Sequence, residues 1–168
     1  MSITLYQASV PVLKRALNNL IAVLQKGAAH AEAKKIDPAV LLGSRLFPDM
    51  FALTRQVQIA TDMAKGCVAR LAGDEPVKLE DGETTFAELI ARVQKVIGII
   101  DGYKPAQIDG SETRDVVLKS PRGDMNFKGL FYLQGFVLPN LYFHATTAYN
   151  ILRHNGVELG KMDFIGQP

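Results

Sequence analysis

The sequence predicts an all-α protein, a four-helix bundle with a short β-hairpin between the third and fourth helices. Three observations support this fold class. Apolar residues recur at steps of three and four in four long segments, which is the spacing of one helix face. Clusters of Gly, Pro and Asn separate these segments and supply stop signals. With 48% apolar residues in 168, the chain has enough apolar material for one core, so we expect a single domain over residues 1–168.

The first helix is expected over residues 2–34. Ser2 is a candidate N-cap, because its hydroxyl can accept from a free backbone amide of the first turn. Pro11 removes one backbone donor, and it is expected to kink this helix or to mark the start of its regular part. Four leucines keep one face turned inward: Leu13, Leu17, Leu20 and Leu24.

The second and third helices are expected over 48–72 and 85–103. Pro48 suits the first position of a helix, where its missing amide costs nothing, and a Gly-Asp-Glu-Pro run ends the segment. Thr84 or Thr85 can cap the third helix, which is strongly apolar along one face.

A hairpin and a fourth helix complete the chain. Between 109 and 129 the helical period disappears, and the apolar runs 116–118 and 125–127 flank a turn-forming cluster over 120–124. The last helix is expected over 129–154, and an Asn-Gly pair stops it. An antiparallel bundle is the simplest way for four such helices to bury their apolar faces.

The last helix carries a polar stripe within its apolar sequence. Asn140, His144 and Thr147 fall at steps of four and three and so lie along one face. Buried imidazole and amide groups need partners, which here are a metal, a ligand, water or neighbouring side chains. Pro139 should displace the carbonyl of Gly135 and open the helix where the stripe begins.

Helix two supplies polar side chains that could meet this stripe. Gln56, Gln58 and Asp62 could face the same space, and Arg55 or Asp49 could reach a pocket at its end. Spacing alone does not separate these residues from solvated ones on the outer face.

Composition and charge exclude several classes of function. A net charge of +2 is too small for a nucleic-acid-binding face, so we expect no nucleic-acid partner. Cys67 is the only cysteine, which excludes an intrachain disulfide and makes a reducing cytoplasm the expected compartment. Residues 129–152 lack charges, but their polar side chains favour a buried bundle helix over a membrane span, and we expect no membrane association.

Several segments resemble one family over nearly the whole chain. They are Tyr142–Val157, which reads YFHATTAYNILRHNGV, the following Gly160-Lys161 and Asp163-Phe164, the opening LYQASVP over 5–11, PDMF over 48–51 and QVQIA over 56–60. These segments are similar to an uncharacterised bacterial family of unknown function within the DinB/YfiT-like superfamily of four-helix bundles. The resemblance implies that fold and makes a homodimer plausible, but it brings no established activity.

The superfamily resemblance also implies a position for a metal. Its members often hold a divalent metal with one histidine from helix two and two, four residues apart, from the last helix, ahead of a Leu-Arg-x-x-Gly ending. Setting residues 152–153 onto that ending puts His144 at the second position and Asn140 at the first, while helix two offers Gln56 or Gln58. One imidazole with two neutral amides makes a poor zinc or nickel site. We therefore expect a degenerate metal site at which His144 is the one remaining ligand.

Three functions follow as hypotheses. The first is a small-molecule-binding bundle that uses the inherited cavity without its metal. Its pocket would be lined by Gln56, Gln58, Asn140, His144 and Tyr149. The second is a metal-dependent hydrolase or thiol transferase of the DinB/YfiT type, with His144 as a zinc or nickel ligand or as a general base. The third is a structural or oligomeric module in which the stripe is an internal hydrogen-bond network.

Overall fold

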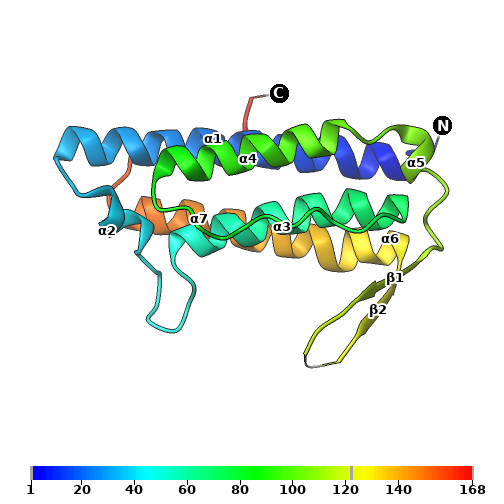
Figure 1. The fold of residues 1–168 in the computed structure, drawn as a ribbon. Helices are drawn as coiled ribbons and strands as arrows, with labels where there is room; N and C mark the ends of the chain where they lie inside the picture. The colour runs from blue at the N-terminus through cyan, green and yellow to red at the C-terminus, as the bar shows by residue number, and fades with distance from the viewer. Residues whose placement is uncertain (1, 122, 168) are drawn as a thin grey trace.

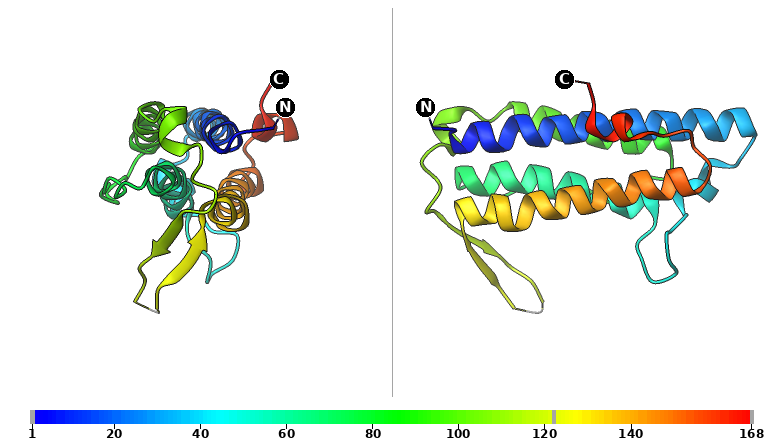
Figure 2. Two further views of the ribbon diagram at one scale, coloured as in Figure 1. Left: turned by 90° about the vertical axis from the view of Figure 1, so that its right-hand side faces the viewer. Right: turned by 180° about the vertical axis from the view of Figure 1, so that it is seen from behind.

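Four long helices pack side by side in two layers in the computed structural model, which describes residues 2–121 and 123–167 (Figure 1). They are α1 (Leu5–Lys34), α3 (Leu53–Ala72), α4 (Phe86–Asp101) and α7 (Leu138–His154). One layer holds α1 and α4, and the other holds α3 and α7 (Figure 2). The predicted helical bundle is therefore confirmed. Arg122, which belongs to the predicted hairpin turn, lies outside the described residues, as do Met1 and Pro168.

The helix directions differ from the expected antiparallel order. The linker over 73–85 runs back along the bundle, so α4 starts at the same end as α3 and runs parallel to it (Figure 1). The side chain of Arg92 on α4 accordingly lies beside Thr61 and Asp62 of α3. The linker can run back along the bundle because it is extended and because Arg92 binds its residues Glu80 and Glu83. The apolar periodicity of the sequence did not indicate these polar contacts.

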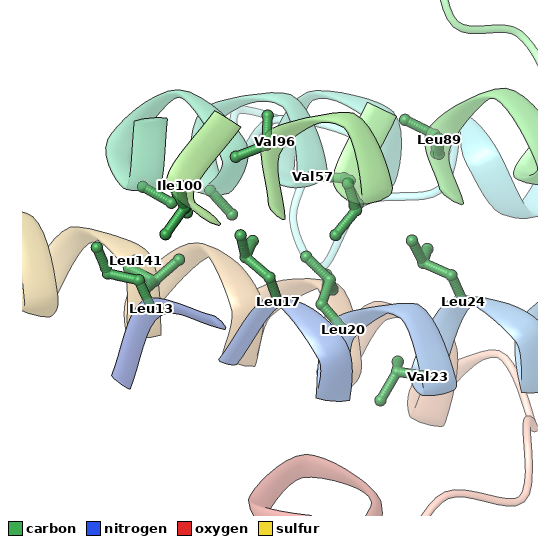
Figure 3. Packing of buried hydrophobic residues seen from close by; sticks show 14 of the residues in the cluster. Leu13, Leu17, Leu20, Val23, Leu24, Val57, Leu89, Val96, Ile100 and Leu141 are labelled. Carbon is green, nitrogen blue, oxygen red and sulfur yellow. The ribbon is translucent and has the colours of Figure 1, made fainter. Parts of the chain in front are cut away.

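The core lies between the two layers. Leu13, Leu17 and Leu24 of α1 are fully buried, and Val96 and Leu89 of the neighbouring α4 lie on the same side of α1 as these leucines (Figure 3). The leucines of α1 are among the apolar positions that the steps of three and four predicted to face inward. Replacing one such leucine by alanine would cost about 2–5 kcal/mol, so this cluster supplies much of the stability of the fold.

The first helix begins at Leu5. Thr4 caps it and Gln7 completes a capping box, so Thr4 takes the role predicted for Ser2. The helix starts before Pro11 and continues through it to Lys34.

The predicted start of the second helix at Pro48 is wrong. After the short α2 (Pro38–Leu42), residues 43–52 form a loop, which the amide of Leu53 closes by donating to the carbonyl of Ser44 at 3.0 Å. The helix begins only at Leu53, because Pro48 takes part in a turn of this loop. The loop projects from the bundle on the side of α3 and α7 (Figures 1 and 2).

The hairpin matches its prediction. After α5 (Pro105–Ile108), β1 (Asp115–Leu118) pairs antiparallel with β2 (Met125–Lys128), with Val116 opposite Phe127. The hairpin projects on the same side of the bundle as the loop over 43–52, but at the opposite end (Figure 1). These two projections flank the outer face of α3 and α7.

The last helical segment is continuous but changes its winding. It comprises α6 (Gly129–Phe131), a π-helical turn η1 (Tyr132–Val137) and then α7. The π turn ends just before Pro139, whose missing amide cannot bond the carbonyl of Gly135. This agrees with the predicted opening of the helix at that point. Asn140 Nδ2 donates to the carbonyl of Phe136 at 2.7 Å within the opened stretch.

The chain ends with α8 (Lys161–Ile165), which packs along the outside of α1. Across residues 2–121 and 123–167, no helix combines the length and the apolar character that a membrane crossing requires.

Candidate ligand site between α3 and α7

The polar stripe on α7 is mostly satisfied within its own helix. Thr147 Oγ1 donates to the carbonyl of Phe143 at 2.7 Å, just as Asn140 donates to the carbonyl of Phe136. His144 is the member of the stripe that reaches across to another helix. Its side chain is only 8% exposed, and it packs at the junction of α7 with α3.

His144 is fixed by a short chain of hydrogen bonds. Its Nδ1 lies 2.6 Å from Oε1 of the buried Gln56 on α3. Gln56 Nε2 in turn donates to the carbonyl of Phe51 at 2.9 Å, so its Oε1 must face the ring. An amide oxygen only accepts, and therefore Nδ1 of His144 carries the proton. Helix α3 and the loop over 43–52 together set the orientation of the imidazole.

The second ring nitrogen of His144 is left as a bare acceptor. Nε2 of His144 has no hydrogen-bond partner among the described residues. Every fully buried side-chain nitrogen or oxygen in that part of the chain does have one, so Nε2 is not fully buried and contacts solvent. Burial, reinforced by the positive charge of Arg55, lowers the pKa of His144 below 6.5. The ring is therefore neutral near pH 7, and Nε2 presents a lone pair to the outside.

Two residues connected to this chain of hydrogen bonds have exposed aromatic side chains. The ring of Phe143 lies edge-on to the His144 ring, with 5.2 Å between centroids, and it is 57% exposed. Phe51, whose carbonyl anchors Gln56, has a side chain that is 54% exposed. Large apolar side chains that are this exposed are typical of a binding surface.

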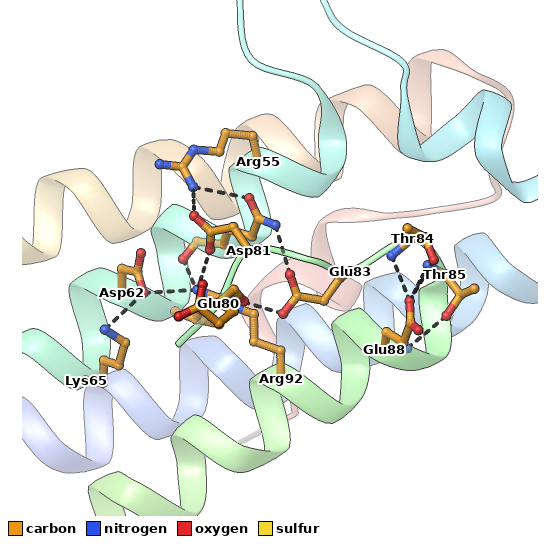
Figure 4. A network of polar contacts seen from close by, with 12 residues as sticks. Arg55, Asp62, Lys65, Glu80, Asp81, Glu83, Thr84, Thr85, Glu88 and Arg92 are labelled. Carbon is orange, nitrogen blue, oxygen red and sulfur yellow. Dashed lines mark hydrogen bonds and ion pairs between the residues drawn. The ribbon is translucent and has the colours of Figure 1, made fainter. Parts of the chain in front are cut away.

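Arg55 supplies the positive charge and is itself held in place. Its guanidinium pairs with Asp81 on the linker and donates to Gln58 Oε1 (Figure 4). Asp81 also pairs with the buried Arg92 of α4 at 3.1 Å. The linker over 73–85 thus restrains a cation near His144.

Gln58 lies apart from His144. It is buried on a different face of α3, where its Nε2 donates to Glu83 at 2.9 Å. Burial raises the pKa of Glu83, but hydrogen bonds from Gln58 and Arg92 outweigh this effect and lower it overall. Gln58 therefore joins α3 to the linker.

Tyr149 also lies apart from His144. Its ring packs against Phe164 of α8, and its hydroxyl donates to the carbonyl of Leu159 at 3.4 Å. Of the five predicted pocket residues, the structure brings Gln56 and His144 into contact and puts Asn140 one turn away on the same helix.

Comparison with known proteins then places the chain in a family. The family described as "Domain of unknown function (DUF1993)" matches residues 5–165. The chain belongs to this family. The DUF1993 assignment agrees with the family resemblance of its segments and fixes no activity.

A solved structure extends this assignment. The chain is 45% identical to a DinB family member protein from Shewanella denitrificans, with a TM-score of 0.88, over 98% of this chain and 93% of that one. This DUF1993 protein is therefore DinB-like in fold. No curated protein matches it.

The residues of this DUF1993 protein do not fit the metal site that the superfamily implies. His144 offers one imidazole nitrogen, Nε2, because Nδ1 is bonded to Gln56, and the side chains of Gln56 and Asn140 would add neutral amide oxygens. Such oxygens are weak ligands for zinc or nickel. Among the residues with described positions, no three His, Cys, Asp or Glu side chains come together as a metal site.

Sequence reasoning missed two contributors to this surface. Phe51 was assigned to the first turn of a helix, although it lies in the loop that anchors Gln56. Phe143 was not singled out beside His144. The available signal was an aromatic residue directly next to the histidine of the polar stripe.

Proposed function

We propose that this DUF1993 protein binds a small organic molecule on the outer face of α3 and α7, without a metal. The observation that carries the proposal is the fixed, neutral imidazole of His144, whose Nε2 is an unpartnered acceptor at the surface. A ligand with an N–H or O–H donor can satisfy Nε2. The exposed rings of Phe51 and Phe143 can cover an apolar or aromatic body.

The arrangement supports binding better than hydrolysis. A general base needs a second group to position or activate the nucleophile. Arg55, the charged residue that acts on His144, is engaged with Asp81 and Gln58 instead. The DinB/YfiT-type hydrolase or thiol transferase remains the alternative, and metal analysis of untagged protein tests it. Near-stoichiometric zinc or nickel that is lost in His144→Ala would favour that alternative over the binding function.

A fragment screen tests the binding function. Phenols and anilines, which join an aromatic ring to a donor, should give ligand-observed NMR signals with the wild type. They should lose these signals with His144→Ala, while His154→Ala, at the exposed end of α7, keeps them. Fragments that bind both variants equally would contradict the proposal. Unfolding of His144→Ala would instead favour a structural role for the stripe.

A homodimer is the second candidate, and it rests on exposed apolar side chains. The hairpin and α6 expose Val117, Met125, Leu130 and Phe131, and the loop over 43–52 exposes Phe47 on the same side of the bundle. A two-stranded hairpin gains little stability alone, so a second copy packed against it would protect both apolar sets. Light scattering should give a dimer for the wild type and a monomer for Phe131→Ser. A monomeric wild type would contradict this candidate.

A further inference from the structure

A cavity of about 340 Å³ lies on the opposite side of α7 from the His144 surface, between α1, α7 and α8. Its volume is at the small end of the range for ligand pockets, about 300–1,000 Å³. The proposed function does not involve this space.

The walls of the cavity are apolar. They include Ala16, Leu20 and Val23 of α1, Ala145 of α7, and Phe164 and Ile165 of α8. Figure 3 shows Val23 pointing from α1 toward α8, while Leu17 and Leu24 point into the bundle core. Burial of an apolar ligand here would remove its apolar surface from water, which favours binding.

The α8 wall is held in position by polar contacts. Asn19 Nδ2 donates to the carbonyl of Phe164 at 2.9 Å, and Lys26 pairs with Asp163 at 2.7 Å. Tyr149 packs its ring against Phe164 from α7. The cavity is therefore bounded by a fastened segment, and Tyr149, predicted as a pocket residue, supports this site.

One edge of the cavity is positively charged. Arg15 is the charged residue among the cavity-lining residues that the structure describes. Its Nε and one terminal nitrogen donate to the carbonyls of Ile165 and Gln167 at 3.2 and 3.1 Å. The other terminal nitrogen has no partner within residues 2–121 and 123–167, and the same is true of the half-exposed Tyr142 hydroxyl. Arg15 and Tyr142 thus both line this apolar space, and no acidic side chain is among its described lining residues.

We infer that this cavity binds a small amphiphilic organic acid, with the apolar body between α1 and α8 and the carboxylate at Arg15 and Tyr142. A guanidinium that is already oriented by two carbonyls loses little side-chain freedom when it binds a carboxylate. The apolar walls select against polar acids, and the single cation selects against amines.

Titration with octanoate and with 1-octanol, followed by amide NMR of the full chain, tests the inference. Octanoate should shift the amides of Ala16, Val23 and Ala145 and bind about tenfold tighter than octanol, the effect of one charge-assisted contact. Arg15→Gln should remove this tenfold preference and leave octanol binding unchanged. Unchanged octanol binding would show that α8 is still docked in that variant.

A filled-cavity variant completes the test. Ala16→Phe should abolish octanoate binding, whereas Ala22→Phe, at an exposed position on the same helix, should retain it. Octanoate that binds Ala16→Phe as tightly as wild type, or that shifts other amides, would overturn the inference. If Ala16→Phe does not fold, the double variant Arg15→Gln/Tyr142→Phe decides, and an unchanged preference for octanoate over octanol would overturn the proposal.

Discussion

Replacing Arg92 by methionine should show how far the linker over 73–85 depends on one buried cation. The Arg92 side chain is only 2% exposed, and its guanidinium binds groups from α3 and from the linker (Figure 4). Its partners are Thr61 Oγ1 at 2.8 Å, the carbonyl of Glu80 at 2.9 Å, Glu83 at 3.0 Å, and Asp62 and Asp81 at 3.1 Å. Methionine keeps much of the apolar stem and removes every one of these contacts.

The expected loss of stability follows from the burial of Arg92 and from the partial exposure of its acidic partners. Removal of one partner from a buried ion pair costs about 3–5 kcal/mol. The side chains of Asp62 and Asp81 are 32% and 40% exposed, so water can partly replace the guanidinium. We therefore expect a loss of about 3 kcal/mol. For a chain of this size, this corresponds to a fall in Tm of about 6–12 °C.

Urea denaturation followed by circular dichroism measures this loss. The matched control is Lys95→Met, which removes an exposed cation one turn along α4 and should change the free energy of unfolding by less than about 0.5 kcal/mol. A loss below about 1 kcal/mol for Arg92→Met, or one equal to that of the control, would refute the reasoning.

Three further predictions concern other buried positions. Burial raises the pKa of Cys67 to about 12, so a thiol reagent should label it only as fast as the chain unfolds; rapid labelling of the folded protein would contradict this. Gly129→Ala should lower the free energy of unfolding in urea by about 3 kcal/mol, because the new Cβ would lie 2.0 Å from the carbonyl oxygen of Ser111. In the control Gly98→Ala the new Cβ has no atom within 4 Å, and the free energy of unfolding should rise by about 0.5–1 kcal/mol. Burial lowers the pKa of His144 below 6.5, so as the pH falls the imidazole is protonated in the unfolded chain before it is protonated in the folded one. The contribution of the neutral imidazole to the free energy of unfolding is therefore full above about pH 6.5 and is lost as the pH falls through the folded-state pKa. Wild type should therefore lose more stability than His144→Gln between about pH 7.5 and about pH 5.5, and parallel losses would count against the assigned shift.

The parts of the fold predicted from sequence are those set by periodicity and local chemistry. The leucines of α1 are buried because their spacing matches the helix repeat, and the π turn before Pro139 follows from the missing amide. The start of α3 was misplaced because Pro48 suits both a first helical position and a turn. The parallel order of α3 and α4 places Arg92 against α3 and the linker, whereas in sequence Arg92 reads as an ordinary polar position.

The candidate site was predicted only in part, for a geometric reason. Gln56 and Gln58 are two residues apart, so they lie on different faces of α3, and sequence alone did not show which face meets α7. Asn140 and Thr147 share the face of His144 but use their donors within their own helix, a choice that depends on backbone positions. The cavity beside α8 was missed because the final segment of the chain carries no strong periodic signal.

The nitrogen NMR shifts of the His144 ring test the central claim most directly. With His144→Gln used to assign the signals, we expect that at about pH 7.5 Nδ1 is protonated and Nε2 is an unprotonated neutral ring nitrogen. Addition of a chelator should leave both shifts unchanged. A proton on Nε2, or a ring signal that moves when a chelator is added, would contradict a metal-free site in which Nε2 is the acceptor for a ligand.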